Sequence, residues 1–248
     1  MPAAAPASMS RLLAVCIGRA APLVVTERGS PETVVSGIVK TALGSPQAPV
    51  AVRIGVLGLE GDEQVDHLVH GGPDKAVYVY PVEHYAFWET VRGQAGAAPL
   101  AAAPAPRPSP SPDGRAASSD AAPAPDAVTP ASGAAVATPD PVTRTCLPPG
   151  AMGENLLVEG LLETEVWIGD RLRIGEVELR VESPRQPCYK FNARMGFKWA
   201  TKMMVQSGYT GFYCSVLRQG SLAAGDGISL APGPRVLTVA QTHRLKRR

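Results

Sequence analysis

The chain has 248 residues, of which 45% are hydrophobic and 19% are charged, and its formal net charge is +2. No apolar run approaches the roughly 20 residues that a membrane-spanning helix needs, and the mixed charge forms no basic surface of the kind that binds nucleic acid. We therefore expect neither a membrane segment nor a nucleic-acid partner.

Proline and alanine are concentrated in one stretch of the chain. Residues 93–145 contain eleven prolines and 17 alanines, but no Ile, Met, Phe, Tyr, Trp, Lys or Glu. Such a stretch buries too little apolar surface to offset the entropy of ordering its backbone. The sequence therefore predicts a single domain over residues 9–230 with a disordered insertion at about 93–145. Residues 1–8 are expected to be a disordered start, and residues 231–248 a basic tail.

In chain order, the first predicted elements are two strands and a helix. Residues 50–54 and 76–80 are β-rich and are bounded by Gly or Pro. Apolar residues at roughly helical spacing predict a short helix over 82–92, just after Pro81. A second short helix is predicted over 199–206.

The clearest predicted element is a hairpin at 171–181. Its turn, Gly175-Glu176, has glycine first, as a type II′ turn prefers. Residues 212–216 form a further alternating strand, which places Cys214 in the core. Many short strands with Gly-rich turns predict a mainly β fold, a closed or nearly closed β-barrel with a few short helices. The hairpin residues expected to face the core are Leu172, Ile174, Val177, Leu179 and Val181.

The cysteines are few and widely spaced. Cys16, Cys146, Cys188 and Cys214 form no C-x-x-C pair and no dense framework, which fits a reducing compartment and predicts a cytoplasmic protein. The chain also lacks a G-x-S-x-G elbow, a Walker A loop, an H-E-x-x-H motif and a G-x-G-x-x-G fingerprint. These absences argue against ordinary serine hydrolases, P-loop NTPases, zinc proteases and Rossmann dehydrogenases.

Two glycine-containing segments could present backbone amides to a ligand. In the first, His70 precedes Gly71 and Gly72, whose N–H groups could form an anion-binding nest with Lys75 close by. The alternative is a tight loop with an exposed lysine. The second segment, at 153–156, is either a polar turn before a strand or a site where an Asn and backbone amides meet a ligand.

A third segment, residues 183–190, directly follows the hairpin and contains Cys188. Its two prolines hold the backbone extended, so that the cysteine is expected on a rigid loop at a strand end. Arg185, Lys190 and Arg194 are nearby in the sequence and favour the thiolate, the form that attacks electrophiles or binds soft metals. A free cysteine is more often inert core, but this polar and cationic setting favours a reactive one.

Together these segments resemble the MOSC domain family (molybdenum-cofactor sulfurase C-terminal domain), especially its stand-alone YiiM-like branch. The family joins the equivalent of Trp88 to the second segment by a short connection, whereas about 60 residues intervene here. The stretches that carry the resemblance are GLEGDEQ at 58–64, HGGPDKAVYVYPVEHYAFW at 70–88, GENL at 153–156, VWIGDRLRIG at 166–175 and SPRQPCYK at 183–190.

The resemblance implies a strand-rich domain that binds molybdenum cofactor, a pterin dithiolene that carries a phosphate and holds molybdenum. Members of this branch and their relatives reduce N-hydroxylated compounds, including hydroxylaminopurine base analogues, to amines. This chain would therefore use a small N-hydroxylated substrate and an unidentified electron-donor protein. By analogy Cys188 would bind molybdenum, and His70 and Lys75 would be catalytic proton sources. The cofactor-binding candidates are His70, Gly71, Gly72, Lys75, Glu154, Asn155, Arg185 and Lys190.

Two other functions use the same residues. In the first, Cys188 carries a persulfide and hands sulfur to a metal cofactor. In the second, the protein carries molybdenum cofactor without turnover. Pyridoxal phosphate enters only by family association, because some members are fused to cysteine desulfurases and this chain has no recognisable desulfurase domain.

Overall fold

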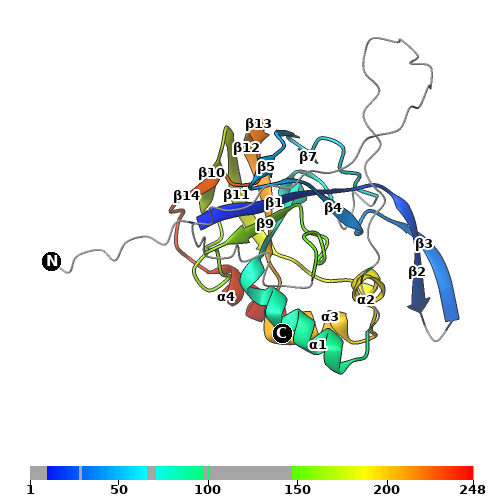
Figure 1. Ribbon diagram of the computed structural model, residues 1–248. Helices are drawn as coiled ribbons and strands as arrows, with labels where there is room; N and C mark the ends of the chain where they lie inside the picture. The colour runs from blue at the N-terminus through cyan, green and yellow to red at the C-terminus, as the bar shows by residue number, and fades with distance from the viewer. Residues whose placement is uncertain (1–9, 28–29, 66–70, 98–99, 101–146, 248) are drawn as a thin grey trace, which may run out of the picture.

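Strand β1 (Ser10–Gly18) pairs with strand β14 (Gly227–Ala231), and this pairing between distant parts of the chain closes a β-barrel (Figure 1). Neighbouring strands of the barrel are antiparallel, except for the parallel pair β8–β9, with β8 at Val77–Pro81 and β9 at Leu156–Glu159. The predicted mainly β, closed-barrel fold is thus confirmed. The barrel order is β14, β10 (Arg171–Ile174), β11 (Val177–Pro184), β12 (Phe212–Arg218), β8, β9 and β1.

The computed structural model describes residues 10–27, 30–65, 71–97, 100 and 147–247. The expected disordered start at 1–8 lies outside the described residues. So does the expected insertion, apart from 93–97 and residue 100.

Two smaller strand groups accompany the barrel. A ribbon of β2 (Ala21–Glu27) and β3 (Ser30–Ser36) projects away from it (Figure 1), and β4 (Lys40–Ser45) returns to pair with β1. The predicted strand at 50–54 is shifted to β6 (Val52–Gly55). The remaining short strands are β5 (Ala48–Pro49), which pairs with β4, and β7 (Gly58–Leu59) and β13 (Gly220–Leu222), which flank β6.

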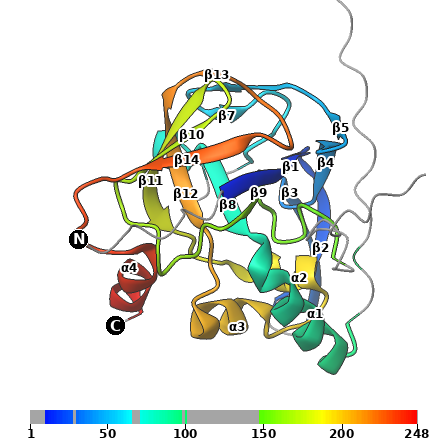
Figure 2. The ribbon, with the colours of Figure 1, turned by 60° about the vertical axis from the view of Figure 1, so that its left-hand side comes forward.

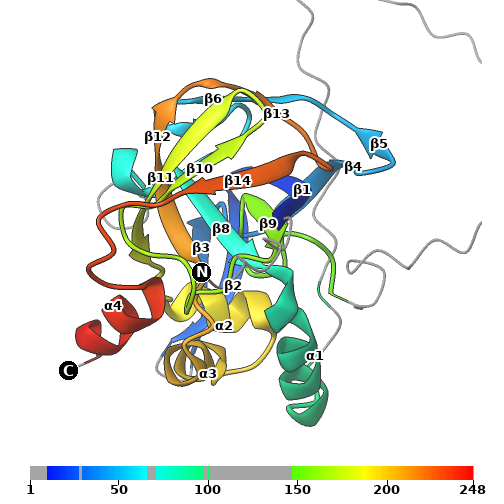
Figure 3. The same cartoon turned by 90° about the vertical axis from the view of Figure 1, so that its left-hand side faces the viewer.

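The helices lie together at one end of the barrel (Figures 2 and 3). The helix predicted at 82–92 is a short 3₁₀ turn, η2 (Val82–His84), that continues into α1 (Tyr85–Gln94). The helix predicted at 199–206 is α3 (Ala200–Ser207). Two helices, α2 (Tyr189–Met195) and α4 (Val239–Lys246), and the 3₁₀ turn η1 (Pro73–Lys75) were not predicted. Among the described residues no helix is both long and apolar enough to cross a bilayer.

The predicted hairpin is present, with Ile174 opposite Val177. The backbone at Gly175 has a φ of +54°, whereas φ at Glu176 is not positive. A type II′ turn requires this combination. A Cβ at position 175 would lie 2.8 Å from the Ser221 carbonyl oxygen, so glycine is also needed for space. All five apolar residues expected to face inward are fully buried, and so is Cys214.

Strands β1 and β8 are buried on both faces, because the barrel interior covers one face and the helices cover the other. On β8, Val77 and Val79 point into the barrel, whereas Tyr78 and Tyr80 pack toward the helices. The run at 12–17 divides in the same way, so its continuous apolar character reflects two-sided burial. This run was not predicted as a strand, because it lacks the alternation of a half-buried one.

Part of the expected basic tail at residues 231–248 forms helix α4. Within residues 231–248, α4 begins with a capping box in which Thr238 and Gln241 satisfy each other's backbone amides. Val239 and His243 are buried, and the helix packs against β11. Arg244 and Lys246 are exposed and therefore lie on the outer face of a docked helix.

Candidate functional site

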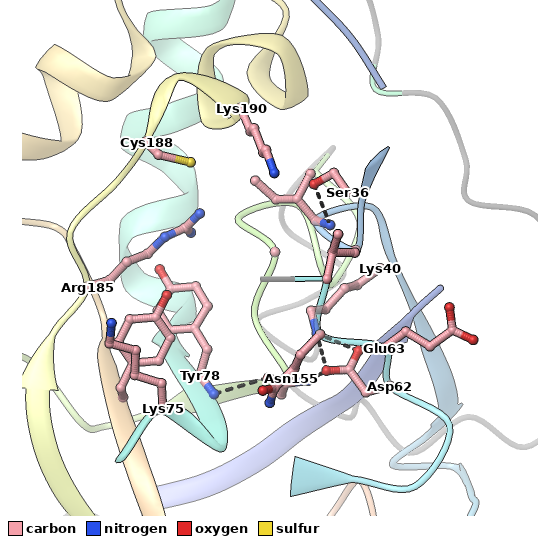
Figure 4. A pocket seen from close by; sticks show the side chains of 16 residues that line it. Ser36, Lys40, Asp62, Glu63, Lys75, Tyr78, Asn155, Arg185, Cys188 and Lys190 are labelled. Carbon is pink, nitrogen blue, oxygen red and sulfur yellow. Dashed lines mark hydrogen bonds and ion pairs between the residues drawn. The ribbon is translucent and has the colours of Figure 1, made fainter. Parts of the chain in front are cut away.

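An open cavity lies where the ends of several barrel strands meet the start of α2 (Figure 4). Cys188 and Arg185 lie on one side of the cavity, and Lys40 and Asp62 lie on the other. The lining residues are Ser36, Gly37, Ile38, Lys40, Asp62, Glu63, Gln64, Val65, Lys75, Tyr78, Gly153, Asn155, Arg185, Cys188, Lys190 and Tyr213.

Cys188 occupies the N-cap position of α2, directly after the proline-rich loop that follows β11. Two hydrogen bonds hold its backbone. The Cys188 carbonyl accepts from the Phe191 amide at 2.9 Å and from the Thr201 hydroxyl at 3.0 Å. Its thiol is partly exposed and points into the cavity. Cys16 and Cys214 are instead fully buried, and burial raises the pKa of both thiols well above its usual range. Among the described cysteines, Cys188 is therefore the one accessible to a ligand.

Arg185 is a rigid cation beside this thiol. Its guanidinium stacks 4.7 Å from the ring centre of Tyr78 and 5.0 Å from that of Phe191, and it donates to the Met152 carbonyl. Desolvation opposes the charge, but the phenols of Tyr78 and Tyr213 and the Cys188 thiol favour it, so the pKa of Arg185 lies above its ordinary value. The charge is thus fixed in place at the cavity wall.

Opposite Arg185, three polar residues form a buried network. The Lys40 ammonium lies 2.6 Å from each carboxylate oxygen of Asp62, and the two side chains are 9% and 4% exposed. Asp62 also accepts from the Gly18 amide at 2.7 Å and from Nδ2 of Asn155 at 2.8 Å. Asn155 accepts in turn from the Tyr78 amide at 3.1 Å. Asn155 therefore lines the cavity, but its side chain is hydrogen-bonded to other groups of the protein.

The Gly-Glu-Asn turn is divided between the cavity and the core. Gly153 lines the cavity with φ of +81°, and a Cβ there would lie 2.8 Å from Cγ1 of Ile38. The Glu154 carboxylate points the other way and is fully buried. It accepts from the Tyr85 hydroxyl, from the Gly150 amide at 2.6 Å and from the Met152 amide at 2.9 Å. The structure therefore places Glu154 behind the site, where it holds the turn.

The His-Gly-Gly segment is only partly described. His70 lies outside the described residues. Gly72 has φ of +93°, and its amide donates to the side-chain oxygen of Gln64, a cavity residue, at 3.3 Å. Gly71 and Gly72 do not themselves line the cavity, whereas Lys75, at the end of η1, does. The loop thus supports the cavity edge through Gln64 and contributes a cation through Lys75.

Of the residues predicted from sequence, the structure brings five together around one cavity, namely Lys75, Asn155, Arg185, Cys188 and Lys190. Sequence reasoning missed Lys40, Asp62, Tyr78 and Tyr213. Asp62 and Tyr78 stand within the motifs that carried the family resemblance, which was the available signal. Lys40 and Tyr213 stand outside every motif, and only the fold brings them to the site.

The lining carries four cationic side chains against two carboxylates. One of the cations, Lys40, is paired with Asp62, and the Glu63 carboxylate accepts from the Ala20 amide at 2.8 Å. The excess of cationic over acidic side chains gives the cavity a positive field, which suits an anionic ligand with a group able to meet a thiol. Among the described residues, no three His, Cys, Asp or Glu side chains are placed to hold a metal ion together.

The chain matches the MOSC domain family over residues 127–229. It is 33% identical over 208 residues to the uncharacterized protein YflK of Bacillus subtilis, covering 84% of this chain and 71% of that protein. It is 30% identical over 201 residues to the protein YiiM of Escherichia coli, covering 81% and 68%. The crystal structure of YiiM from Geobacillus stearothermophilus has the same fold, with a TM-score of 0.58 and 24% identity over 96% of this chain and 83% of that one.

This chain therefore belongs to the MOSC domain family, and the protein YiiM is among its relatives.

Proposed function

We propose that this protein binds molybdenum cofactor in the cavity and reduces N-hydroxylated compounds to amines. The observation that carries the proposal is the convergence of one accessible thiol, Cys188, with three cations, Lys75, Arg185 and Lys190, around one cavity. Family membership supplies the identity of the cofactor class, and the residues present fit it.

The fit rests on the chemistry of the lining groups. The cofactor has an anionic phosphate, which suits the ammonium groups of Lys75 and Lys190 and the guanidinium of Arg185. Its metal accepts soft donors, which suits a cysteine thiolate. Cys188 would therefore hold the metal, and the cations would hold the phosphate and the pterin edge.

When bound, the cofactor supplies the two-electron redox chemistry of the reaction. The overall change is R–NHOH plus two electrons and two protons to R–NH₂ plus water. The chain's own residues fix the position of the reacting groups and supply protons. Burial raises the pKa of the Tyr213 hydroxyl, so this cavity residue keeps its proton at neutral pH and can donate it in a hydrogen bond. Lys75, also on the lining, is the proposed proton source.

Sulfur transfer through a Cys188 persulfide is the competing function. It also needs an accessible thiol, but it does not need a cavity with a positive field on the walls around that thiol. The lining charges favour a resident anion, and so favour the cofactor over transfer alone.

The test is molybdenum content, measured by elemental analysis on protein purified from a host that makes the cofactor. Wild type is compared with Cys188→Ser, and with Cys214→Ala as a cysteine control inside the barrel. We expect close to one molybdenum per chain in wild type and in the control, and less than a tenth of that in Cys188→Ser. Reduction of 6-hydroxylaminopurine with reduced methyl viologen should follow the metal content. Absence of molybdenum from wild type, together with a trapped persulfide on Cys188, would replace this proposal with sulfur transfer.

A further inference from the structure

Two exposed lysines lie on the surface where α2 leads into α3. Residues 183–225 contain no Asp or Glu, whereas 183–208 contain five Arg or Lys residues. Two of the five, Arg185 and Arg194, are buried, and Lys190 lines the cavity. The remaining two, Lys198 and Lys202, are exposed. These two lysines therefore display positive charge to solvent where α2 leads into α3.

Trp199 lies between the two exposed lysines and is itself 55% exposed. The Lys198 ammonium is 5.0 Å from the centre of a Trp199 ring and the Lys202 ammonium is 5.6 Å away, so that both cations sit against the indole. A large aromatic side chain usually gains stability from burial. Trp is enriched at protein interfaces, where it often serves as an anchor inside a polar rim.

Thr201, which lies between Trp199 and Lys202 in the sequence, links this surface to the proposed metal-binding cysteine. The Thr201 hydroxyl donates to the Cys188 carbonyl at 3.0 Å, and the Thr201 amide donates to Oδ1 of Asn192 at 2.8 Å. The first turn of α3, which follows Trp199, is therefore bonded to the first turns of α2, and α2 begins at the cavity (Figure 4).

We propose that Lys198, Trp199 and Lys202, here called the α2–α3 face, dock an acidic electron-transfer protein that delivers electrons to the cavity. This inference rests on the proposed function, because reduction of one N-hydroxyl group consumes two electrons. A one-electron carrier would bind twice per turnover and leave oxidised each time, and the two protons come from solvent through the lining. Electron-transfer encounters use small interfaces in which charge guides the approach. A face with one aromatic anchor and two flanking cations fits an acidic partner of that kind.

The test uses full-length protein and an acidic flavodoxin as the probe. Lys198→Glu/Lys202→Glu reverses the two charges of the face, and Lys246→Glu/Arg247→Glu reverses two exposed charges on α4 as a matched control. Binding to immobilised flavodoxin is measured at low and high salt, and turnover is measured with reduced flavodoxin and with reduced methyl viologen. The binding measurement needs no cofactor in the protein, so it stands even if the proposed reaction is wrong.

We expect flavodoxin affinity and flavodoxin-driven kcat/KM to fall at least tenfold in the α2–α3 variant and less than twofold in the control. Viologen-driven turnover should stay within twofold of wild type in both. Trp199→Ala should weaken binding while leaving its salt dependence in place. The proposal is overturned if both charge variants lose affinity equally or if neither does. It is also overturned if a single-stranded oligonucleotide competes for the same face at physiological salt.

Discussion

The Lys40 ammonium lies 2.6 Å from both carboxylate oxygens of Asp62, and this pair ties the start of β4 to the loop that follows β7. The same carboxylate accepts from the Gly18 amide at the end of β1 and from Asn155 just before β9. Four segments that are far apart in the sequence thus meet at one side chain. Asp62 therefore shapes the cavity wall, and removing its charge should disturb stability and site together.

Asp62→Asn should destabilise the protein by about 3–5 kcal/mol, because it leaves the buried Lys40 ammonium without its counter-charge. The measurement is the free energy of unfolding from urea titration. In Lys40→Met/Asp62→Asn both charges are absent, so we expect this double variant to be more stable than Asp62→Asn by about 1 kcal/mol or more. Equal stability of the two variants would show that the pair contributes little.

Glu154→Gln should lower stability by about 1–3 kcal/mol while molybdenum content per folded molecule stays within twofold of wild type. The buried carboxylate accepts three hydrogen bonds, and a glutamine would turn its NH₂ group toward one of the donors. Glu159→Gln, in a partly exposed ion pair with Arg11, is the control and should change stability by less than about 0.5 kcal/mol. Loss of molybdenum at unchanged stability would instead return Glu154 to the cofactor-binding residues.

Lys75→Met and Lys190→Met should each weaken binding of inorganic pyrophosphate to the apoprotein by roughly three- to tenfold, since each removes one charge-assisted contact to an anion. Calorimetric titration gives the affinity. Lys198→Met, on the surface outside the cavity, serves as the matched control and should bind as wild type does. An equal loss in all three variants would mean that overall charge, and not the cavity, attracts the anion.

Much of the fold could be predicted because its strands carry local signals. The β10–β11 hairpin has strict alternation and a glycine where φ must be positive, so its register followed from the sequence. Strand β1 was missed because it is buried on both faces, and no alternation distinguishes such a run from other apolar segments. Helix α4 was not predicted because its basic residues were interpreted as a tail, and the capping box at Thr238 was overlooked.

The site was predictable where one motif holds several of its residues. Arg185, Cys188 and Lys190 are close in sequence, and they also meet in space. Glu154 shows the limit of such reasoning, because adjacent residues of a turn can point to opposite sides. Lys40 and Tyr213 come from a strand start and a barrel strand with no motif around them, so only tertiary structure could add them.

Alkaline pH should destabilise the protein through its buried thiols. Burial raises the pKa of Cys16 and of Cys214, so in the folded state both keep their protons at pH values where the unfolded chain releases them. The folded state then binds more protons than the unfolded state, and stability falls as pH rises above the unfolded thiol pKa of about 8.5. The slope approaches about 1.4 kcal/mol per pH unit for each buried thiol.

Cys214→Ala removes one of these groups and leaves the other cysteines unchanged. Between pH 8 and pH 10 the variant should therefore lose about 2 kcal/mol less stability than wild type, even if it starts lower because of the lost packing. Urea titrations at closely spaced pH values, under a reducing agent, give both curves. Parallel curves would mean that Cys214 ionises equally in the folded and unfolded states, which would contradict its complete burial in the barrel core.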